Sequence, residues 1–234
     1  MPLPSEQAGA GTTRGANSIT TGELPLFQAA GALEPDPERT GGLLVAADES
    51  FSSVTRIQLD ETSWVDHAPG WLAGGGELMS LLMDQAEWER RSRWMYTRMV
   101  AEPRLTAEHL VIADAPQPVL HYLAAVLSAH YGRLYTRLWM NWYRDNSDGT
   151  GWHADRPQNK LDETVIPVLS LGAARRFLIR PAGGGPSKSI VAHGGDLIVM
   201  GGRCQKDYVH SVPKQKQATG ARFSLNFSTL VADD

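Results

Sequence analysis

The 234-residue sequence contains no run of eighteen apolar residues, and its first 22 residues have neither the basic start nor the apolar stretch of a signal peptide. We therefore expect a soluble, cytoplasmic monomer with no membrane partner. Cysteine is also nearly absent. The single residue, Cys204, excludes a disulfide within the chain and fits a reducing compartment. We expect it to be a small core residue in a turn.

Basic residues do not outnumber acidic ones either. The net charge of −4 argues against a nucleic-acid partner, because phosphate binding relies on a basic footprint. The charge is uneven, however: residues 1–62 hold nine acids and three bases, whereas residues 63–234 hold nineteen bases and seventeen acids. One stretch combines arginines and aromatic residues suited to backbone and base contacts: Arg90, Arg91, Arg93, Trp94, Tyr96, Arg98 and Arg104. Its alternative interpretation is a solvated helix end running into an ordinary strand.

Hydropathy divides the chain into an arm and one domain. Residues 1–41 lack the apolar content for a core, so we expect a flexible acidic arm there and a single domain at 42–234. Apolar residues recur at helical spacing over 76–92 and 117–131. Strand-like runs follow at 135–143, 164–171, 175–180, 188–192, 196–200 and 221–230. Helices followed by short strands predict an α+β domain with a double-sheet sandwich.

Two predicted strands carry polar side chains on one face. Successive residues of a strand point to opposite faces, so Arg137, Asn141 and Tyr143 share a face. In the last strand the odd positions are apolar, and the even positions are Arg222, Ser224, Asn226 and Ser228. A polar face is ordinarily the solvent side of a sheet. Here that interpretation is weakened, because neighbouring segments carry candidate metal ligands.

His153 and Asp155 lie two residues apart, so on extended backbone both side chains can meet one ion. The turn-forming segment 146–151 precedes them, and functional groups tend to collect at such loop ends. The third ligand is His193 or His210. His193 precedes two glycines at a hairpin entrance, where a histidine without a metal role is commoner, so we choose His210. The other histidines are expected to be structural or on the surface: His67, His109, His121 and His130.

Two imidazoles and one carboxylate can occupy one face of Fe(II), leaving the other face open for a co-substrate and O2. Twelve residues beyond His210, Arg222 offers a planar, two-pronged donor for a carboxylate. Asn141 and Tyr143 can add neutral hydrogen bonds. A dicarboxylic keto acid fits: one end chelates iron while the far carboxylate meets Arg222 and Tyr143. The co-substrate predicted in this way is 2-oxoglutarate.

With these residues in place, the chain resembles the AlkB family of Fe(II)/2-oxoglutarate-dependent nucleic-acid demethylases over roughly residues 60–230. The segments that carry the resemblance occur in family order: Ala68–Leu72, Glu102–Thr106, Leu138–Asp145, Gly151–Asp155, Val168–Gly172, Arg176–Arg180, Gly195–Met200, His210–Pro213 and Arg222–Phe227. The ordered set is far more specific than any one of its members.

The resemblance implies a double-stranded β-helix (jelly-roll, cupin-like) core with N-terminal supporting helices and a nucleotide-recognition lid. It implies that His153, Asp155 and His210 bind iron and that the co-substrate site comprises Asn141, Tyr143, Arg222, Ser224 and Ser228. It also implies that methylated DNA or RNA meets Arg93, Trp94, Tyr96, Arg98, Arg104 and Arg156. The reaction implied is oxidative demethylation of an extruded or single-stranded base, as in alkylation damage repair, which releases formaldehyde, succinate and CO2.

The chain departs from the family pattern at two places. Where the family commonly has a second arginine six residues after Arg222, this chain has Ser228, and we hypothesise that Arg137 or a bound water compensates. Acidic residues that often follow the His-x-Asp pair are replaced by residues 156–158, Arg-Pro-Gln. Two alternatives therefore remain: an oxygenase acting on a protein or small molecule, and a metal-binding β-sandwich that has lost catalysis and serves as a binding module.

Overall fold

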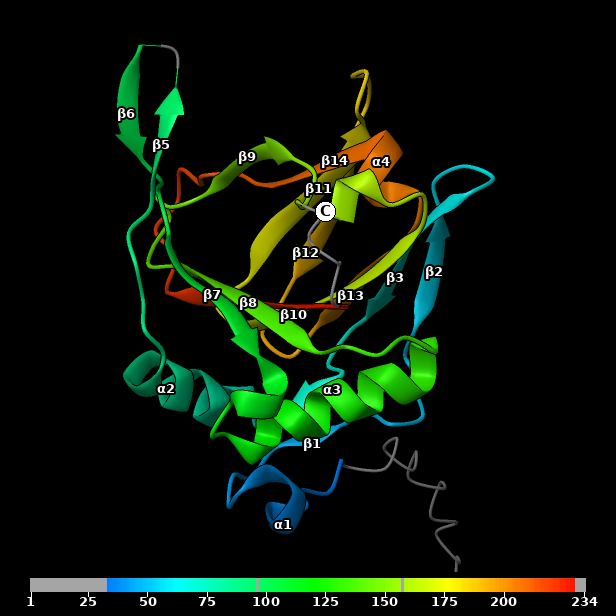
Figure 1. Cartoon of the computed structure of the whole chain (residues 1–234), viewed down its shortest axis with the longest axis vertical. Coiled ribbons are helices and arrows are strands. Elements are labelled where there is room, and N and C mark those ends of the chain that lie inside the picture. The colour runs from blue at the N-terminus through cyan, green and yellow to red at the C-terminus, as the bar shows by residue number, and fades with distance from the viewer. Residues whose placement is uncertain (1–32, 96, 157, 230–234) are drawn as a thin grey trace, which may run out of the picture. The chain divides into compact units, whose positions relative to one another are not determined.

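Two antiparallel sheets form the body of the domain (Figure 1). The computed structural model describes residues 33–95, 97–156 and 158–229. The larger sheet has the strand order β2-β3-β13-β10-β15-β8-β7, and the smaller has the order β12-β11-β14-β9. The larger sheet comprises β2 Thr55–Gln58, β3 Ser63–Ala68, β7 Leu105–Val111, β8 Arg137–Tyr143, β10 Thr164–Gly172, β13 Leu197–Gly202 and β15 Arg222–Ser228. The smaller comprises β9 Thr150–His153, β11 Arg175–Pro181, β12 Lys188–Ala192 and β14 Tyr208–Val212.

The six predicted strands are confirmed with shifts of one or two residues at their ends. Further strands were not predicted, among them β3, β9 and β14. The α+β class with antiparallel sheets is therefore confirmed. Short elements complete the domain: α1 Pro37–Thr40, β1 Ala46–Ala47, β4 Leu72–Ala73, β5 Ser92–Met95, β6 Arg98–Ala101, α4 Cys204–Asp207 and the 3-10 turns Ile112–Asp114 and Gln158–Lys160.

Helices α2 (Gly75–Gln85) and α3 (Pro118–Tyr131) cover the outer face of the larger sheet (Figure 1). Three leucines of α3 are fully buried: Leu120, Leu123 and Leu127. They belong to the same hydrophobic cluster as the apolar face of β15, which consists of Phe223, Leu225 and Phe227. The predicted helix over 117–131 is confirmed. It begins with Pro118, whose missing N–H is not needed there, and ends at Gly132 in the left-handed conformation.

The other helix was predicted over 76–92, and its predicted C-terminal end is wrong, because α2 ends at Gln85. Trp88 leaves the helical path and packs against Trp142 and Phe223, with ring centroids 5.4 and 4.8 Å away. Its indole Nε1 donates a hydrogen bond of 3.1 Å to the carbonyl oxygen of Leu82. The indole thus satisfies a carbonyl near the helix end, and tertiary packing ends the helix early.

Strand β15 is buried on both faces. Its apolar side chains face the helices, and its polar side chains lie on the face that borders the space between the two sheets. The solvent-side interpretation of that polar face is therefore wrong. The register with β8 places Arg222 opposite Tyr143, Ser224 opposite Asn141 and Asn226 opposite Trp139, with a fourth pair, Ser228 opposite Arg137, at the far end. These pairs form a continuous polar row.

The N-terminal arm expected at 1–41 lies mostly outside the described residues, which begin at 33. Within the described part, Asp36 caps the one-turn helix α1 by accepting hydrogen bonds from the N–H groups of Glu38 and Arg39, so the last residues of the expected flexible arm are helical. No helix among the described residues is long and apolar enough to span a membrane. Cys204 is buried at the start of α4, and burial raises the pKa of its thiol to about 12, as expected of an unreactive core residue.

Candidate active site

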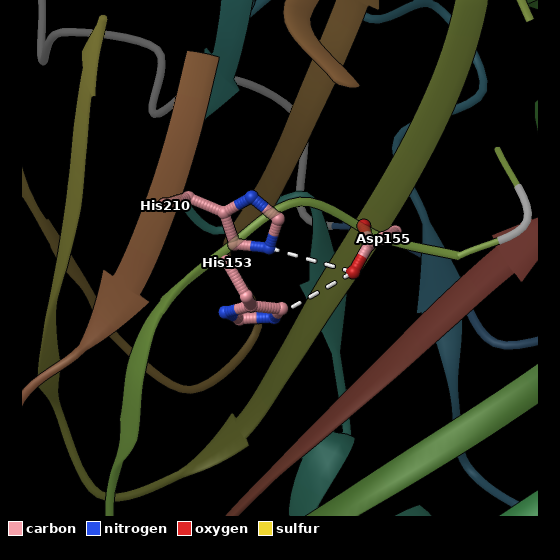
Figure 2. A group of neighbouring side chains, drawn as sticks. All are labelled: His153, Asp155 and His210. Carbon is pink, nitrogen blue, oxygen red and sulfur yellow. Dashed lines mark ion pairs between the residues drawn. The ribbon is translucent and has the colours of Figure 1, made fainter. Parts of the chain in front are cut away.

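Three potential metal ligands converge between the sheets (Figure 2). His153 ends β9, Asp155 follows two residues later, and His210 lies in β14 directly opposite His153 in the register. One carboxylate oxygen of Asp155 lies 3.6 Å from Nε2 of His153 and 3.5 Å from Nε2 of His210. All three ligand atoms lie within 4.8 Å of one another. Two imidazoles on neighbouring strands and a carboxylate just after one of them form the donor set that iron oxygenases use.

The protein fixes these ligands in a form ready for a cation. Nδ1 of His153 lies 2.8 Å from the carbonyl oxygen of Gly151, which leaves Nε2 facing the site. Burial, followed by the charge of His210, lowers the pKa of His153 to about 4, so its imidazole is neutral near pH 7. Burial alone would raise the pKa of Asp155, but the two histidines lower it, so this side chain is a carboxylate. Its second oxygen is buried without a hydrogen-bond partner among the described residues.

The alternative third ligand, His193, lies elsewhere. Its side chain is 66% exposed and pairs with Asp196 at 3.5 Å. The choice of His210 is confirmed by the convergence of the three ligands. The structural roles expected for the other histidines also fit: His67 contacts Asp196, and His121 contacts the carbonyl oxygen of Ala115. His130 stacks on Phe51, whereas the side chain of His109 lies outside the described part of the chain.

The polar row of β8 and β15 faces the metal ligands across a cavity of about 770 Å³. Arg222 is only 1% exposed, and its Nη2 donates a hydrogen bond of 2.9 Å to Ser170. Its Nε and Nη1 atoms are buried without a partner among the described residues. Burial lowers the pKa of Arg222, and a buried cation with unused N–H groups is costly unless an anion arrives. Arg222 is therefore suited to receive a carboxylate.

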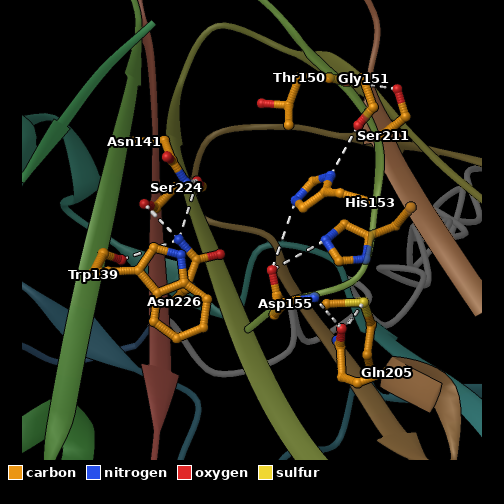
Figure 3. Close-up of polar contacts among 12 residues, drawn as sticks. Trp139, Asn141, Thr150, Gly151, His153, Asp155, Gln205, Ser211, Ser224 and Asn226 are labelled. Carbon is orange, nitrogen blue, oxygen red and sulfur yellow. Dashed lines mark hydrogen bonds and ion pairs between the residues drawn. The ribbon is translucent and has the colours of Figure 1, made fainter. Parts of the chain in front are cut away.

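Neighbouring side chains extend this polar row (Figure 3). Asn141 donates a hydrogen bond of 3.2 Å to Ser224. The hydroxyl groups of Tyr143 and Thr150 lie 2.9 Å apart. Asn226, which the sequence did not single out for a role, donates to the carbonyl oxygen of Trp139 and to Ser224. Asn141, Tyr143, Arg222, Ser224 and Ser228 all line the cavity. The structure thus brings the five residues of the predicted co-substrate site together.

The predicted substrate-contacting residues are dispersed. Trp94 on β5 is 67% exposed, and Arg98 on β6 and Arg156 are exposed. Arg104 instead points inward, donating a hydrogen bond of 2.6 Å to Thr150 and forming an ion pair with Glu102 at 3.0 Å. Tyr96 and the side chain of Arg93 lie outside the described residues, so the substrate contacts expected of them stay predictions.

Comparison with known proteins decides the family. Residues 79–227 match the 2OG-Fe(II) oxygenase superfamily. The chain belongs to this superfamily. Its cofactors are therefore Fe(II) and 2-oxoglutarate, and His153, Asp155 and His210 are the residues that hold the iron.

Several curated relatives are AlkB homologues. The chain is 28% identical over 197 residues to the alpha-ketoglutarate-dependent dioxygenase alkB homolog 3 of Rattus norvegicus, a match that covers 76% of this chain and 62% of that protein. It is 28% identical over 155 residues to the DNA oxidative demethylase ALKBH2 of Homo sapiens, covering 62% of this chain and 59% of that protein. The chain thus spans about three fifths of the length of these relatives.

Solved structures confirm the fold. The structure of OsALKBH1 superposes with a TM-score of 0.53 at 13% identity, covering 75% of this chain and all of that one. A 2OG-Fe(II) oxygenase family oxidoreductase from Burkholderia pseudomallei superposes with a TM-score of 0.51 at 16% identity, covering 70% and 84% of the two chains. The double-stranded β-helix expected from the sequence is therefore the fold of this enzyme.

Proposed function

We propose that this enzyme oxidatively demethylates N-alkylated bases in DNA or RNA, releasing formaldehyde, succinate and CO2. One observation carries the proposal. Arg91, Glu102 and Arg104, which flank the hairpin formed by β5 and β6, line the same cavity as the metal ligands. A substrate held by this hairpin would therefore reach the iron. The curated relatives named as dioxygenases and DNA oxidative demethylases support the reaction class.

The β5–β6 hairpin projects away from the two sheets (Figure 1). Trp94 and Met99 are opposite each other in its register, and both are more than half exposed. Arg98 adjoins this apolar pair and is exposed as well. An exposed aromatic ring beside cationic side chains is suited to stacking on a base while the phosphates are neutralised. We propose that this hairpin is the nucleotide-recognition lid.

We propose that the residues on the two sides of the cavity bind different groups. Arg222, Tyr143 and Asn141 of the larger sheet hold 2-oxoglutarate. His153, Asp155 and His210 hold the iron, which activates O2 when co-substrate is bound. The cavity lies between the two sheets, so a target base must leave a duplex or come from a single strand to reach it. Arg156 is exposed and lines the cavity beside the metal pair, and we propose that it contacts the substrate.

The test is product analysis over single- and double-stranded oligonucleotides that carry different N-methylated bases, with Fe(II), 2-oxoglutarate and ascorbate. Formaldehyde and the unmodified base are expected from at least one oligonucleotide, and a His153→Ala variant serves as the control. If succinate forms without any oligonucleotide being demethylated, the oxygenase acts on another class of substrate. If no succinate forms under any condition, the domain is a binding module.

A further inference from the structure

We propose that Arg137 is a second anion-binding residue of the co-substrate site and holds the carboxylate of 2-oxoglutarate that Arg222 does not. The proposal concerns 2-oxoglutarate alone and is independent of the substrate proposed above. Arg137 begins β8, lies on the same strand face as Asn141 and Tyr143, and lines the cavity. It is therefore part of the polar row that ends in Arg222.

The first line of evidence is an unused donor. The Nε atom of Arg137 is buried and has no hydrogen-bond partner among the described residues. No carboxylate in the described part of the chain forms an ion pair with this guanidinium. Removing a cationic N–H from water without a partner costs free energy, so such a group is expected where a ligand supplies the partner. Arg104 and Arg222, which also line the cavity, each have a buried Nε without a partner among the described residues as well.

Other buried or cavity arginines are held by the protein through part of their guanidinium, although Nε of Arg104 and Nε of Arg175 also lack a partner among the described residues. Arg175 donates to the carbonyl oxygens of Asp145, Asp148 and Pro213, so its guanidinium fastens loops together. Arg104 is paired with Glu102 and Thr150. These contacts give both arginines a structural partner. Arg137 differs because its guanidinium has no hydrogen-bond or ion-pair partner among the described residues.

The second line of evidence is room. Ser228, directly opposite Arg137 in the register, has a small side chain and is 2% exposed. Side chains directly opposite each other on antiparallel strands are neighbours, so a longer side chain at position 228 would compete with Arg137 for space. The small residue on one strand and the long cation on its neighbour are complementary. The cation at this end of the row therefore comes from β8 and not from β15.

The third line of evidence is the match between two cations and a dianion. Arg137 lies opposite Ser228, which is six positions after Arg222 on β15. At about 3.3 Å per residue, the two ends of the row are about 20 Å apart. Arg222 leans along the row, because its guanidinium bonds Ser170, which lies opposite Ser224. An Arg137 side chain that extends along the row from the other end would shorten the gap that a ligand must bridge. A dicarboxylate gives each guanidinium one carboxylate partner.

Binding of 2-oxoglutarate without turnover is the decisive measurement. The full-length protein is loaded with Zn(II), and 2-oxoglutarate is titrated calorimetrically in the absence of any oligonucleotide. Arg137→Ala is expected to weaken binding at least about tenfold, because a charge-assisted hydrogen bond is lost. Arg133→Ala removes the same charge from an exposed position four residues earlier and is expected to leave binding unchanged. Circular dichroism checks that each variant is folded.

Moving the positive charge from position 137 on β8 to position 228 on β15 tests whether Arg137 binds the ligand or only stabilises the fold. In the double variant Arg137→Ala/Ser228→Arg, the guanidinium returns from the opposite strand, and we expect most of the lost affinity to return. Arg137→Gln, which keeps an amide donor and most of the length, serves if the alanine variant does not fold. The proposal is overturned if Arg137→Ala or Arg137→Gln binds 2-oxoglutarate within twofold of the wild type. It is also overturned if the double variant binds no better than Arg137→Ala.

Discussion

The side-chain carbonyl oxygen of Gln205 accepts a hydrogen bond of 2.8 Å from the main-chain N–H of Asp155 (Figure 3). Gln205 is 1% exposed and belongs to α4, the short helix that leads directly into the strand carrying His210. One buried amide thus couples the loop of the carboxylate ligand to the segment that precedes the second imidazole. We expect the position of Asp155 to depend on this contact, because the loop after β9 has no strand partner at Asp155.

We therefore expect Gln205→Met to weaken metal binding by about tenfold to a hundredfold, as loss of a supporting hydrogen bond does in other metal sites. The measurement is a Co(II) titration followed by absorbance. Lys206→Met is the control, because the side chain of the neighbouring Lys206 pairs with Asp162 at the surface. A lower melting temperature with unchanged Co(II) affinity would show that Gln205 stabilises the fold but does not position Asp155.

His153→Ala is expected to abolish conversion of 2-oxoglutarate to succinate, because two ligands cannot retain the iron in a productive geometry. Succinate formation without any other substrate is the measurement. The matched control is His193→Ala, which removes an exposed imidazole outside the cluster. The control variant should keep wild-type turnover. Residual turnover in His153→Ala would refute the assignment of the iron site.

Trp94→Ala is expected to weaken oligonucleotide binding by at least about fivefold, since stacking of one base on an aromatic side chain contributes roughly 1–3 kcal/mol. Succinate formation without oligonucleotide should not change. Leu134→Ala, which alters another exposed apolar side chain, is the control for fluorescence anisotropy measurements. Affinity should also fall as salt rises if the neighbouring arginines contact phosphates. Salt-independent binding would remove the arginines from the interface.

Gly201→Ala is expected to destabilise the domain by about 1–3 kcal/mol, because a Cβ there would meet the ring of Trp64 at 2.0 Å. Relief requires that the indole or strand β13 move. Gly183→Ala is the control, since a Cβ at that position meets nothing within 4 Å. Urea denaturation gives both free energies of unfolding. Equal stability of the two variants would mean that Trp64 repacks at no cost.

Asp148 is expected to make stability depend on pH. Burial alone would raise its pKa, but hydrogen bonds from Arg144, two of them from the guanidinium at 2.7 and 2.8 Å, lower it below its usual range. A depressed carboxyl pKa stabilises the folded state above the unfolded value, about 3.9, and this contribution is lost as pH falls through the folded pKa. Asp148→Asn should therefore be less stable at pH 7, and the difference from wild type should shrink below about pH 4. A difference that is constant with pH, measured by urea denaturation, would exclude this linkage.

Local sequence determined the parts of the site that depend on neighbouring residues. The two-residue spacing of His153 and Asp155 already places both side chains on one side of an extended segment. Strand alternation likewise put Asn141 and Tyr143 on one face, and capping residues set the limits of α3. The strands with strong period-two patterning were found for the same reason. Each of these features follows from backbone geometry within a few residues.

Only the tertiary structure decided which faces and segments meet. The pairing of β14 with β9 brings His210 beside His153, although 57 residues separate them in the chain. The polar face of β15 resembles a solvent face locally, and it is buried because a second sheet lies across from it. Helix α2 ends before Trp88 because this side chain packs against β8 and β15. The side chain of Arg104 points inward because it contacts Thr150 and Glu102. Long-range packing determines these features, and local periodicity does not encode it.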